Sequence, residues 1–446
     1  MSLENLEEIE ELIENKEFRK IKSELEDENV VDIAEFLSEL ENKYLAVIFR
    51  LLPKKKAAEV FSYMEKDQQM VLLDLFSDKE MKDVMDSMFA DDMVDLLEDM
   101  PANVVTRVLG KVDKETREAV NKMLKYPDDS AGSIMTIEFV ELAPDMTVAQ
   151  ALDKIRQVGI KSETVYSCYV VKNHELLGVV SAKDLMTNPV ETPIADLMNE
   201  NIISVHTTDD REEVANLFRK YDLIALPVLD VEDYMVGIVT VDDAIDVLTT
   251  ETTEDMQKMA AMTVSEESYF DTSVFQHAKN RIVWLLILML SSTFTGMIIT
   301  KYENAFAAVP LLVSFIPMLM DTGGNCGSQS STLIIRGLAI DEIHFNDIFK
   351  IVWKEFRVSM LVSLALALAN GVRVYIMYHD LSMAVVVAFS LVFTVVVAKL
   401  IGCMLPVFAK MIRLDPAIMA APLITTIVDL CSIMIYFKIA TMVFKL

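Results

Sequence analysis

Residues 282–300 form a run of 19 residues without a charged side chain. At a rise of about 1.5 Å per helical residue, this run matches the roughly 30 Å hydrocarbon core of a membrane. Further apolar stretches follow it. We predict spans near residues 281–301, 305–337, 351–378, 382–410 and 416–444. Five spans would put the two ends of the chain on opposite sides, so the sequence predicts a polytopic membrane protein.

Charge is divided unevenly along the chain. Residues 271–446 contain 13 Lys and Arg against 10 Asp and Glu, whereas the rest contains 27 against 59, a net charge of −32. Such an acidic part argues against a nucleic-acid partner, which is bound through basic patches. In the short connections between spans, eight Lys and Arg lie on the side of the acidic part and four on the other. This predicts a multi-pass protein of the inner or plasma membrane, with cytoplasmic N-terminal domains and the C-terminus outside.

The second predicted span is unusually polar for membrane depth. Its polar and helix-weakening residues are Asp321, Asn325, Ser328, Gln329, Pro317, Gly323, Gly324 and Gly327. We expect these prolines and glycines to weaken or break the helix, and freed backbone groups are tolerated only inside protein or against water. A lined cavity is therefore predicted. The alternative is a face of small residues for helix packing.

The fifth predicted span carries an acidic face. Asp415 and Pro416 are typical of a helix start, with an Asp cap and Pro at the first helical position. Residues at helical spacing then share one face: Pro422, Thr425, Thr426 and Asp429. A lone carboxylate at this depth costs about 3 kcal/mol. We interpret Asp429 as facing a cation pathway, and the alternative is a buried ion pair with another helix.

The acidic part is divided into three regions. Residues 1–128 are predicted to be an all-α domain of stacked short helix pairs, because apolar residues recur there at helical spacing. Residues 129–190 and 191–250 form an internal repeat in which Gly178 matches Gly237 and Asp184 matches Asp243, an offset of 59. Each unit is predicted to be α+β and resembles the cystathionine-β-synthase (CBS) domain, which occurs as tandem pairs. That resemblance implies an adenine nucleotide such as ATP as ligand, and the alternative is a dimerisation module without ligand.

Residues 251–278 are predicted to be an acidic connecting helix that leads into the membrane domain, residues 279–446. Asp243 and Asp246 share one helix face, and Glu251, Glu254 and Asp255 share another. Like charges at 4 Å repel by about 4 kcal/mol at an effective dielectric of 20. A compact arrangement therefore needs bridging cations, with Mg²⁺ or Ca²⁺ as the natural oxygen-seeking ions. The alternative is a solvated acidic face.

This order of regions resembles the MgtE family of magnesium channels from about residue 20 onward. The resemblance is most specific at residues 323–329, 415–417 and 422–429. It implies a homodimer in the lipid membrane with a pore on the two-fold axis, conducting Mg²⁺ into the cell. By the same resemblance, the pore residues are Asp429, Asp415 and Asn325, supported by Gly324, Pro422, Thr425 and Thr426. It further implies cytoplasmic magnesium sensing by Glu59, Asp91, Asp95, Glu212, Asp222, Asp243, Asp246, Glu251, Glu254 and Asp255.

Other functions stay open at this point. A CBS-regulated carrier or channel could take another divalent cation such as Mn²⁺ or Co²⁺, an anion or an organic solute, and a nucleotide-sensing scaffold would transport nothing. An intramembrane metalloprotease would need an H-E-x-x-H helix, and the five histidines form no such pair. The chain is therefore not expected to be an enzyme.

Overall fold

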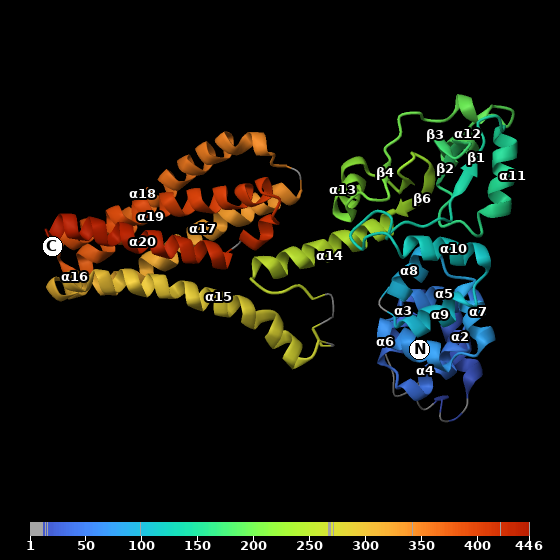
Figure 1. Cartoon of the computed structure of the whole chain (residues 1–446), viewed down its shortest axis with the longest axis horizontal. Helices are drawn as coiled ribbons and strands as arrows, with labels where there is room; N and C mark the ends of the chain where they lie inside the picture. Colours follow the sequence, from blue (N-terminus) through green and yellow to red (C-terminus); the bar gives the residue numbers. More distant parts are fainter. Residues whose placement is uncertain are drawn as a thin grey trace. The chain divides into compact units, whose positions relative to one another are not determined.

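The computed structural model describes residues 12–13, 15, 17–98, 100–265, 269–270, 272–340, 342–419 and 421–445. The chain divides into two compact units, Met1–Leu248 and Thr249–Leu446 (Figure 1). The first unit contains short helices and two small sheets, and the second consists mainly of long helices. This arrangement confirms the multidomain fold class predicted from the sequence.

Short helices form the N-terminal part of the first unit. They are α2 (Phe18–Asp27), α3 (Val30–Glu39), α4 (Asn42–Phe49), α5 (Lys54–Ser62), α6 (Lys66–Leu75), α7 (Asp78–Met85), α8 (Ala90–Glu98), α9 (Ala102–Leu109) and α10 (Lys114–Met123). Most of them pack against the helix two positions along, as α3 does with α5, α5 with α7 and α7 with α9. Their apolar faces share a continuous core that includes Leu37, Ile48 and Phe61. The predicted stack of helix pairs is confirmed.

Side-chain caps fix the starts of α3, α7 and α10. The side chains of Ser77 and Glu80 form a capping box at the start of α7. Arg50 pairs with Glu80 at 2.7 Å, and this hydrogen bond holds the pKa of Glu80 at about 2. At α7 a charged surface residue therefore also helps to define where the helix begins.

Two similar three-stranded sheets follow. The elements are β1 (Val140–Leu142), α11 (Val148–Val158), β2 (Ser167–Lys172), β3 (Glu175–Ser181), α12 (Ala182–Thr187) and the 3₁₀ turn η1 (Ile194–Asp196), then β4 (Val205–His206), α13 (Arg211–Tyr221), β5 (Ala225–Leu229), β6 (Met235–Thr240) and α14 (Val241–Met259). In each sheet the first strand runs parallel and the third antiparallel to the middle strand. The internal repeat is thus a structural repeat.

The repeated glycines leave room for a crossing segment in both sheets. A Cβ on Gly178 would lie 2.8 Å from the side chain of Met198, and one on Gly237 would lie 2.7 Å from the carbonyl oxygen of Thr136. Next to each glycine, the crossing segment pairs with the sheet, at Val179 and at Ile238. The sequence motif therefore marks where each sheet pairs with a segment of the other repeat: the segment before β4 pairs with β3, and the segment before β1 pairs with β6.

Long helices build the second unit. They are α15 (Val274–Lys301), α17 (Ile316–Ala339), α18 (Ile348–Tyr378), α19 (Leu381–Met411) and α20 (Ala421–Phe444), with α16 (Glu303–Ala308) and the 3₁₀ turns η2 (Pro310–Phe315), η3 (Phe345–Asp347) and η4 (Pro416–Met419) between them. α18 packs along α19, and α17 lies against both α19 and α20. Among the described residues, four helical segments are long and apolar enough to cross a membrane: Val274–Lys301, Ile348–Tyr378, Leu381–Met411 and Pro416–Phe444.

The second predicted span differs from the expectation in two ways. α17 is long enough to cross a membrane, but it is not among the four segments that are apolar enough, so the second predicted span, and with it the total of five spans, stays a prediction. The helix is also continuous through its glycines, with Pro317 in its first turn, where the missing N–H costs nothing. The expected break at Gly323, Gly324 and Gly327 was wrong.

These glycines make close helix packing possible instead. A Cβ on Gly323 would lie 2.8 Å from Ser432 of α20 and from Thr394 of α19, and one on Gly327 would lie 2.8 Å from Ile424. The small-residue packing face, the alternative to a helix break, describes this side of α17.

Two other boundaries also differ. Asp415 and Pro416 start a helical segment, as predicted, but its first turn is the 3₁₀ turn η4, and α20 follows from Ala421. The acidic connecting helix, expected over residues 251–278, is the end of α14, which begins at Val241 and stops at Met259. A helix that starts directly after β6 joins the second repeat to the connecting segment without an intervening loop.

Candidate functional site

A polar stripe runs along one side of α17. Asp321, Asn325 and Gln329 follow one another at intervals of four residues and are all exposed in the single chain. The glycines on the other side are buried. Exposed carboxyl and amide groups on a helix at membrane depth must face water or protein rather than lipid. If α17 crosses the membrane as predicted, the stripe marks a surface that lipid does not cover.

The acidic face of α20 lies close to this stripe. Asp429 is half-buried, and Asp321 is near enough to influence it electrostatically. The hydroxyls of Thr425 and Thr426 both donate to the carbonyl oxygen of Pro422, at 2.9 Å and 3.0 Å. Their hydrogens are used within the helix, so these hydroxyls present acceptor oxygens outward. Two helices thus bring carboxylate, amide and hydroxyl oxygens to one region.

Gly324 joins the two helices at this point. A Cβ on Gly324 would lie 3.0 Å from the side chain of Thr425. The structure therefore brings together most of the residues expected in the pore: Asn325, Gly324, Pro422, Thr425, Thr426 and Asp429 lie on the adjoining helices α17 and α20.

Asp415 lies before the turn that leads into α20. Its Oδ1 accepts the N–H of Ala417 at 2.8 Å, which fixes the carboxylate at the start of η4. Its Oδ2 accepts from the Nζ of Lys258, near the end of α14, at 2.6 Å. Lys258 also pairs with Glu254. The sequence showed Lys258 only as the single basic residue of an acidic helix and gave no sign of this contact.

A second group of carboxylates gathers in the first unit, and we call it the carboxylate cluster. It consists of Asp91, Asp92, Asp95, Glu163, Asp242, Asp243 and Asp246. The residues come from α8, from α14 and, in the case of Glu163, from the loop between α11 and β2. The helical domain and both repeats therefore meet at this cluster.

Burial and mutual repulsion raise the pKa values of these carboxyls. Burial, together with Asp95 and Asp242, raises the pKa of Asp92 to about 6. Burial raises the pKa of Asp243 to about 7, although the hydroxyl of Thr240 donates to its carboxylate at 2.6 Å. Burial and neighbouring aspartates raise the pKa of Glu163 to about 8. The cluster is thus costly to charge and would be stabilised by added positive charge.

Part of the carboxylate cluster was predicted from the sequence. Asp91, Asp95, Asp243 and Asp246 were expected, whereas Asp92, Asp242 and Glu163 were not among the expected sensing residues. Asp92 adjoins Asp91 in the sequence, and Asp242 adjoins Asp243, so both pairs offered a signal. Glu163 lies in a loop without a pattern, and only the fold brings it to α8 and α14.

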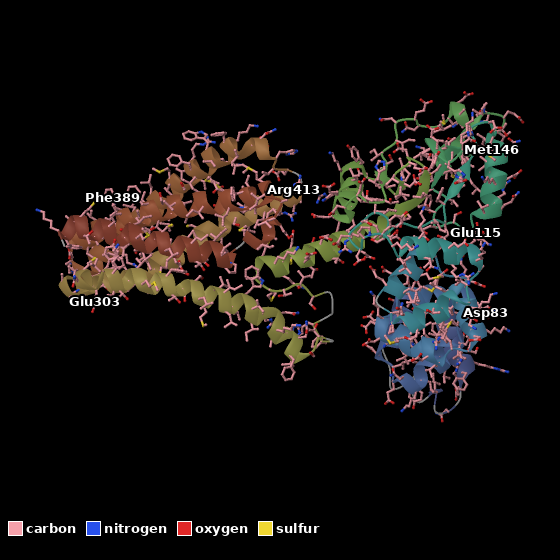
Figure 2. All side chains as sticks on the ribbon, in the orientation of Figure 1. Asp83, Glu115, Met146, Glu303, Phe389 and Arg413 are labelled. Carbon is pink, nitrogen blue, oxygen red and sulfur yellow. The ribbon has the colours of Figure 1, made fainter. Side chains whose placement is uncertain are left out.

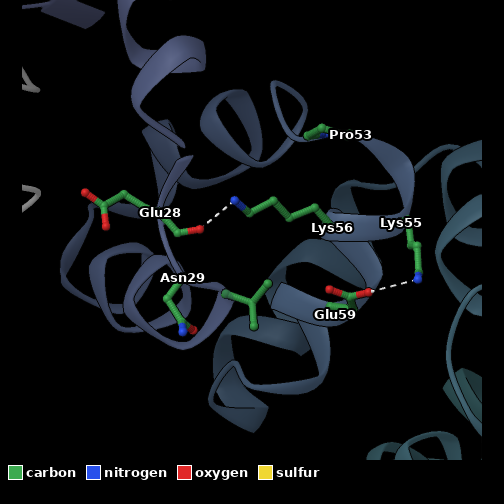
Figure 3. Close-up of a pocket in the computed structure, with 7 residues that line it drawn as sticks. Glu28, Asn29, Pro53, Lys55, Lys56 and Glu59 are labelled. Carbon is green, nitrogen blue, oxygen red and sulfur yellow. Dashed lines mark hydrogen bonds and ion pairs between the residues drawn. The ribbon is translucent and has the colours of Figure 1, made fainter. Parts of the chain in front are cut away.

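Several expected sensing residues lie elsewhere. Glu59 pairs with Lys55 at 3.7 Å and lines a cavity of about 450 Å³ (Figure 3). Glu212 lies in the first turn of α13, and Asp222 ends that helix in a left-handed conformation, with φ of 52°. Glu251, Glu254 and Asp255 lie on α14 beyond the carboxylate cluster. Burial and then Asp415 raise the pKa of Asp255 to about 6.

The chemistry of these groups suits a hydrated divalent cation. Among the described residues, no three or more His, Cys, Asp or Glu side chains form a ready metal cage. Mg²⁺ usually keeps several waters and is held through one or two carboxylates, so it does not need such a cage. The carboxylate cluster and the Asp255–Asp415 pair therefore fit Mg²⁺ in their donor chemistry.

An acidic unit with a CBS-like repeat, joined to helices long and apolar enough to cross a membrane, indicates a membrane transporter. Comparison with known proteins gives the family. The model described as "Divalent cation transporter" (MgtE) matches residues 316–439, the MgtE intracellular N domain matches 28–129, and CBS domains match 131–191 and 194–250. The chain belongs to the MgtE family.

Individual relatives agree over nearly the full length. The magnesium transporter MgtE of Thermus thermophilus is 35% identical over 442 residues, covering 98% of both chains. That of Bacillus subtilis is 33% identical over 430 residues, covering 94% of this chain and 95% of the relative. Among solved structures, the cytosolic domain of the Mg²⁺ channel MgtE in complex with ATP has a TM-score of 0.51 at 35% identity, covering 53% of this chain and 98% of that one.

Proposed function

We propose that this protein conducts Mg²⁺ across the membrane into the cell and that cytoplasmic Mg²⁺ closes it. The observation that carries the proposal is the oxygen-rich face formed by α17 and α20, with Asp429 and Asn325 on it. A carboxylate that contacts the water shell of an ion suits Mg²⁺, which dehydrates reluctantly. The magnesium transporters that match this chain from end to end support the choice of ion.

We propose a homodimer with its pore between the two copies. The exposed stripe of Asp321, Asn325 and Gln329 supports this arrangement, because lipid cannot cover it but a second copy across a water-filled path can. Asp429 of each copy would then contact the hydrated ion, and Asp415 would lie at the cytoplasmic mouth. The C-terminus would lie outside, as five spans require.

We further propose that the carboxylate cluster and the end of α14 sense cytoplasmic Mg²⁺. Repulsion among buried carboxylates favours a splayed arrangement, and a bound divalent cation favours a compact one. Mg²⁺ must therefore bind the closed form more tightly than the open form. The residues that would hold the ion are Asp91, Asp95, Asp243 and Asp246 in the cluster and Glu254, Asp255 and Asp415 at the mouth, with Glu59, Glu212, Asp222 and Glu251 as further sensing residues.

The test is Mg²⁺ flux into proteoliposomes while Mg²⁺ is titrated on the cytoplasmic face. Wild type should conduct at low Mg²⁺ and close as the concentration reaches millimolar levels. Asp429→Asn should conduct poorly or lose selectivity. Asp347→Asn removes a carboxylate that pairs with Lys350 before α18, and it should conduct as wild type does. Absence of wild-type flux would refute the transport proposal.

A second candidate is transport of another divalent cation such as Mn²⁺ or Co²⁺. The family description names divalent cations rather than magnesium alone, which keeps this candidate open. Competition by Mn²⁺ and Co²⁺ against Mg²⁺ flux in the same proteoliposomes decides between the two candidate functions.

ATP is proposed as a ligand of the CBS pair. The structural repeat and the ATP complex of the related cytosolic domain support this proposal. A shift in thermal stability on adding ATP, compared with GTP, tests it, and no step of the transport mechanism depends on it.

A further inference from the structure

Lys258 holds the end of α14 at the carboxylate that precedes η4. It is the only Lys or Arg in residues 241–259, next to the last residue of the helix. Its Nζ donates to Asp415 Oδ2 at 2.6 Å and also pairs with Glu254. The side chains of Lys258, Glu254 and Asp415 are 24%, 25% and 30% exposed, so the interactions are partly shielded from water. A shielded charge pair is stronger than a surface pair of the same geometry.

Apolar packing supports the same contact. Met259 packs against Ile335 of α17 and Ala417 of η4, whose exposed fractions are 3% and 1%. The last turn of α14 therefore meets both the turn before α20 and the C-terminal part of α17. Lys258 lies beside an apolar anchor, so its ammonium is positioned rather than free to move in solvent.

The chain that follows α14 is also fixed. The side-chain amide of Gln257 donates to the carbonyl of Ser265 at 3.0 Å and accepts the N–H of Ser265 at 2.8 Å. The N–H of Thr263 donates to the carbonyl of Asn280 at 2.8 Å. These bonds tie the end of α14 to α15, so a displacement of Lys258 from Asp415 would also move the start of the first membrane helix.

The negative charge around Lys258, at the end of α14, is only partly balanced. The charged groups that act on Asp255 are three carboxylates, Glu251, Glu254 and Asp415, and one cation, Lys258. Asp415 has one oxygen committed to the backbone of Ala417 and the other to Lys258. Lys258 thus neutralises part of the negative charge at the mouth, and the Asp415 carboxylate keeps acceptor sites for the water shell of a mobile cation.

We propose that Lys258 is a positioning residue for closure of the pore. Its ammonium holds α14 against Asp415 and supplies part of the positive charge that the closed state needs. Mg²⁺ then supplies only the rest of the positive charge that the closed state needs. This inference rests on the proposed Mg²⁺-gated transport. It predicts that the Mg²⁺ concentration needed for closure depends on the charge at position 258.

The test compares Lys258→Gln and Lys258→Met with Lys258→Arg in the full-length protein. Flux in proteoliposomes gives the cytoplasmic Mg²⁺ concentration for half closure, and hydrogen exchange of residues 249–259 reports the contact without transport. We expect both neutral variants to need about tenfold more Mg²⁺, a change of about 1.4 kcal/mol, and to exchange faster. Lys258→Arg should restore both readouts. Lys279→Gln removes the same charge from an exposed lysine of α15 and should change neither.

The outcomes separate the two proposals. The role of Lys258 is overturned if the neutral variants close at the wild-type Mg²⁺ concentration or a lower one and if hydrogen exchange of residues 249–259 is unchanged. Wild-type protein without Mg²⁺ flux overturns the transport proposal instead, and the exchange of residues 249–259 still tests the contact. If residues 249–259 also exchanged faster in Lys279→Gln, the change in exchange would depend on net charge alone, and the role of Lys258 would be overturned as well.

Discussion

Gly327 of α17 and Gly402 of α19 are in backbone contact, because a Cβ placed on Gly402 would overlap the carbonyl oxygen of Gly327. No side chain can be inserted there without moving one of the two helices. We therefore expect Gly402→Ala to destabilise the membrane domain by at least 1–3 kcal/mol, the usual cost of overpacking. Thermal unfolding in detergent measures the change.

Gly296 of α15 provides the control for that substitution. A Cβ on Gly296 would meet no atom within 4 Å. Gly296→Ala should leave the melting temperature unchanged or raise it slightly, since alanine favours a helix. Equal melting of both variants would show that α17 and α19 are not closely packed.

A buried ion pair supplies a second prediction. Lys399 of α19 lies 3.9 Å from Glu355 of α18, with side chains only 6% and 12% exposed, and Ser330 of α17 bridges them by donating to Glu355 at 2.7 Å. Lys399→Met should destabilise the domain by about 3–5 kcal/mol, because it leaves a buried carboxylate unpaired. Lys399→Met combined with Glu355→Leu should recover most of the loss. A double variant as unstable as the single one would contradict this account.

The carboxylate cluster predicts a pH dependence of stability. The pKa values of Asp92, Asp243 and Glu163 are raised to about 6, 7 and 8, so between about pH 4 and 8 the folded state binds more protons than the unfolded chain. The free energy of unfolding should fall as pH rises through this window. Melting curves of the protein in a chelator, from pH 5 to 8.5, measure it.

The same cluster provides the control for the pH prediction. Glu163→Gln removes the group with the highest pKa of the three, so the stability of this variant should depend less on pH near 8. Mg²⁺ should stabilise wild type more at pH 8 than at pH 5, because protons and cations relieve the same repulsion. Stability that rises between pH 5 and 8 in the chelator would be inconsistent with buried, mutually repelling carboxyls.

Lys56 gives a prediction for the helical domain. Its Nζ donates to the carbonyl oxygens of Leu25, Glu26 and Glu28, at 2.7, 2.9 and 2.6 Å, and so caps the C-terminal end of α2. Figure 3 shows the bond to Glu28. Lys56→Met should destabilise this domain by about 1.5–3 kcal/mol, as expected for hydrogen bonds from a charged group. Lys55→Met is the matched control, because Lys55 is exposed and its pair with Glu59 is long at 3.7 Å. A similar melting temperature for both variants would show that Lys56 does not stabilise the end of α2.

The sequence predicted the elements better than their contacts. Helical spacing indicated the helix stack, and the matching positions of Gly178 and Gly237 indicated two repeats, because both patterns are local and periodic. The end of α14 at Met259 was missed because acidic residues continue beyond it and composition does not show where a helix stops.

Side-chain partners were harder to predict. Figure 2 shows how densely side chains cover both units, and the sequence alone cannot tell which of them meet. Lys258 and Asp415 are 157 residues apart, and Lys399 and Glu355 come from different helices. The glycines of α17 were read as helix breakers because their neighbours on α19 and α20 were unknown. Glycine weakens an isolated helix, but close packing against other helices can outweigh this cost.

The glycine contacts between α17, α19 and α20 also limit how the membrane domain can change shape. Where backbones touch, no layer of side chains is available to slide or repack, and separating the helices would strip contacts that nothing replaces. These three helices should therefore move as one rigid body. Bending is left to the short 3₁₀ turn η2, which leads into α17 from outside this group, because η4 joins two helices of the same group.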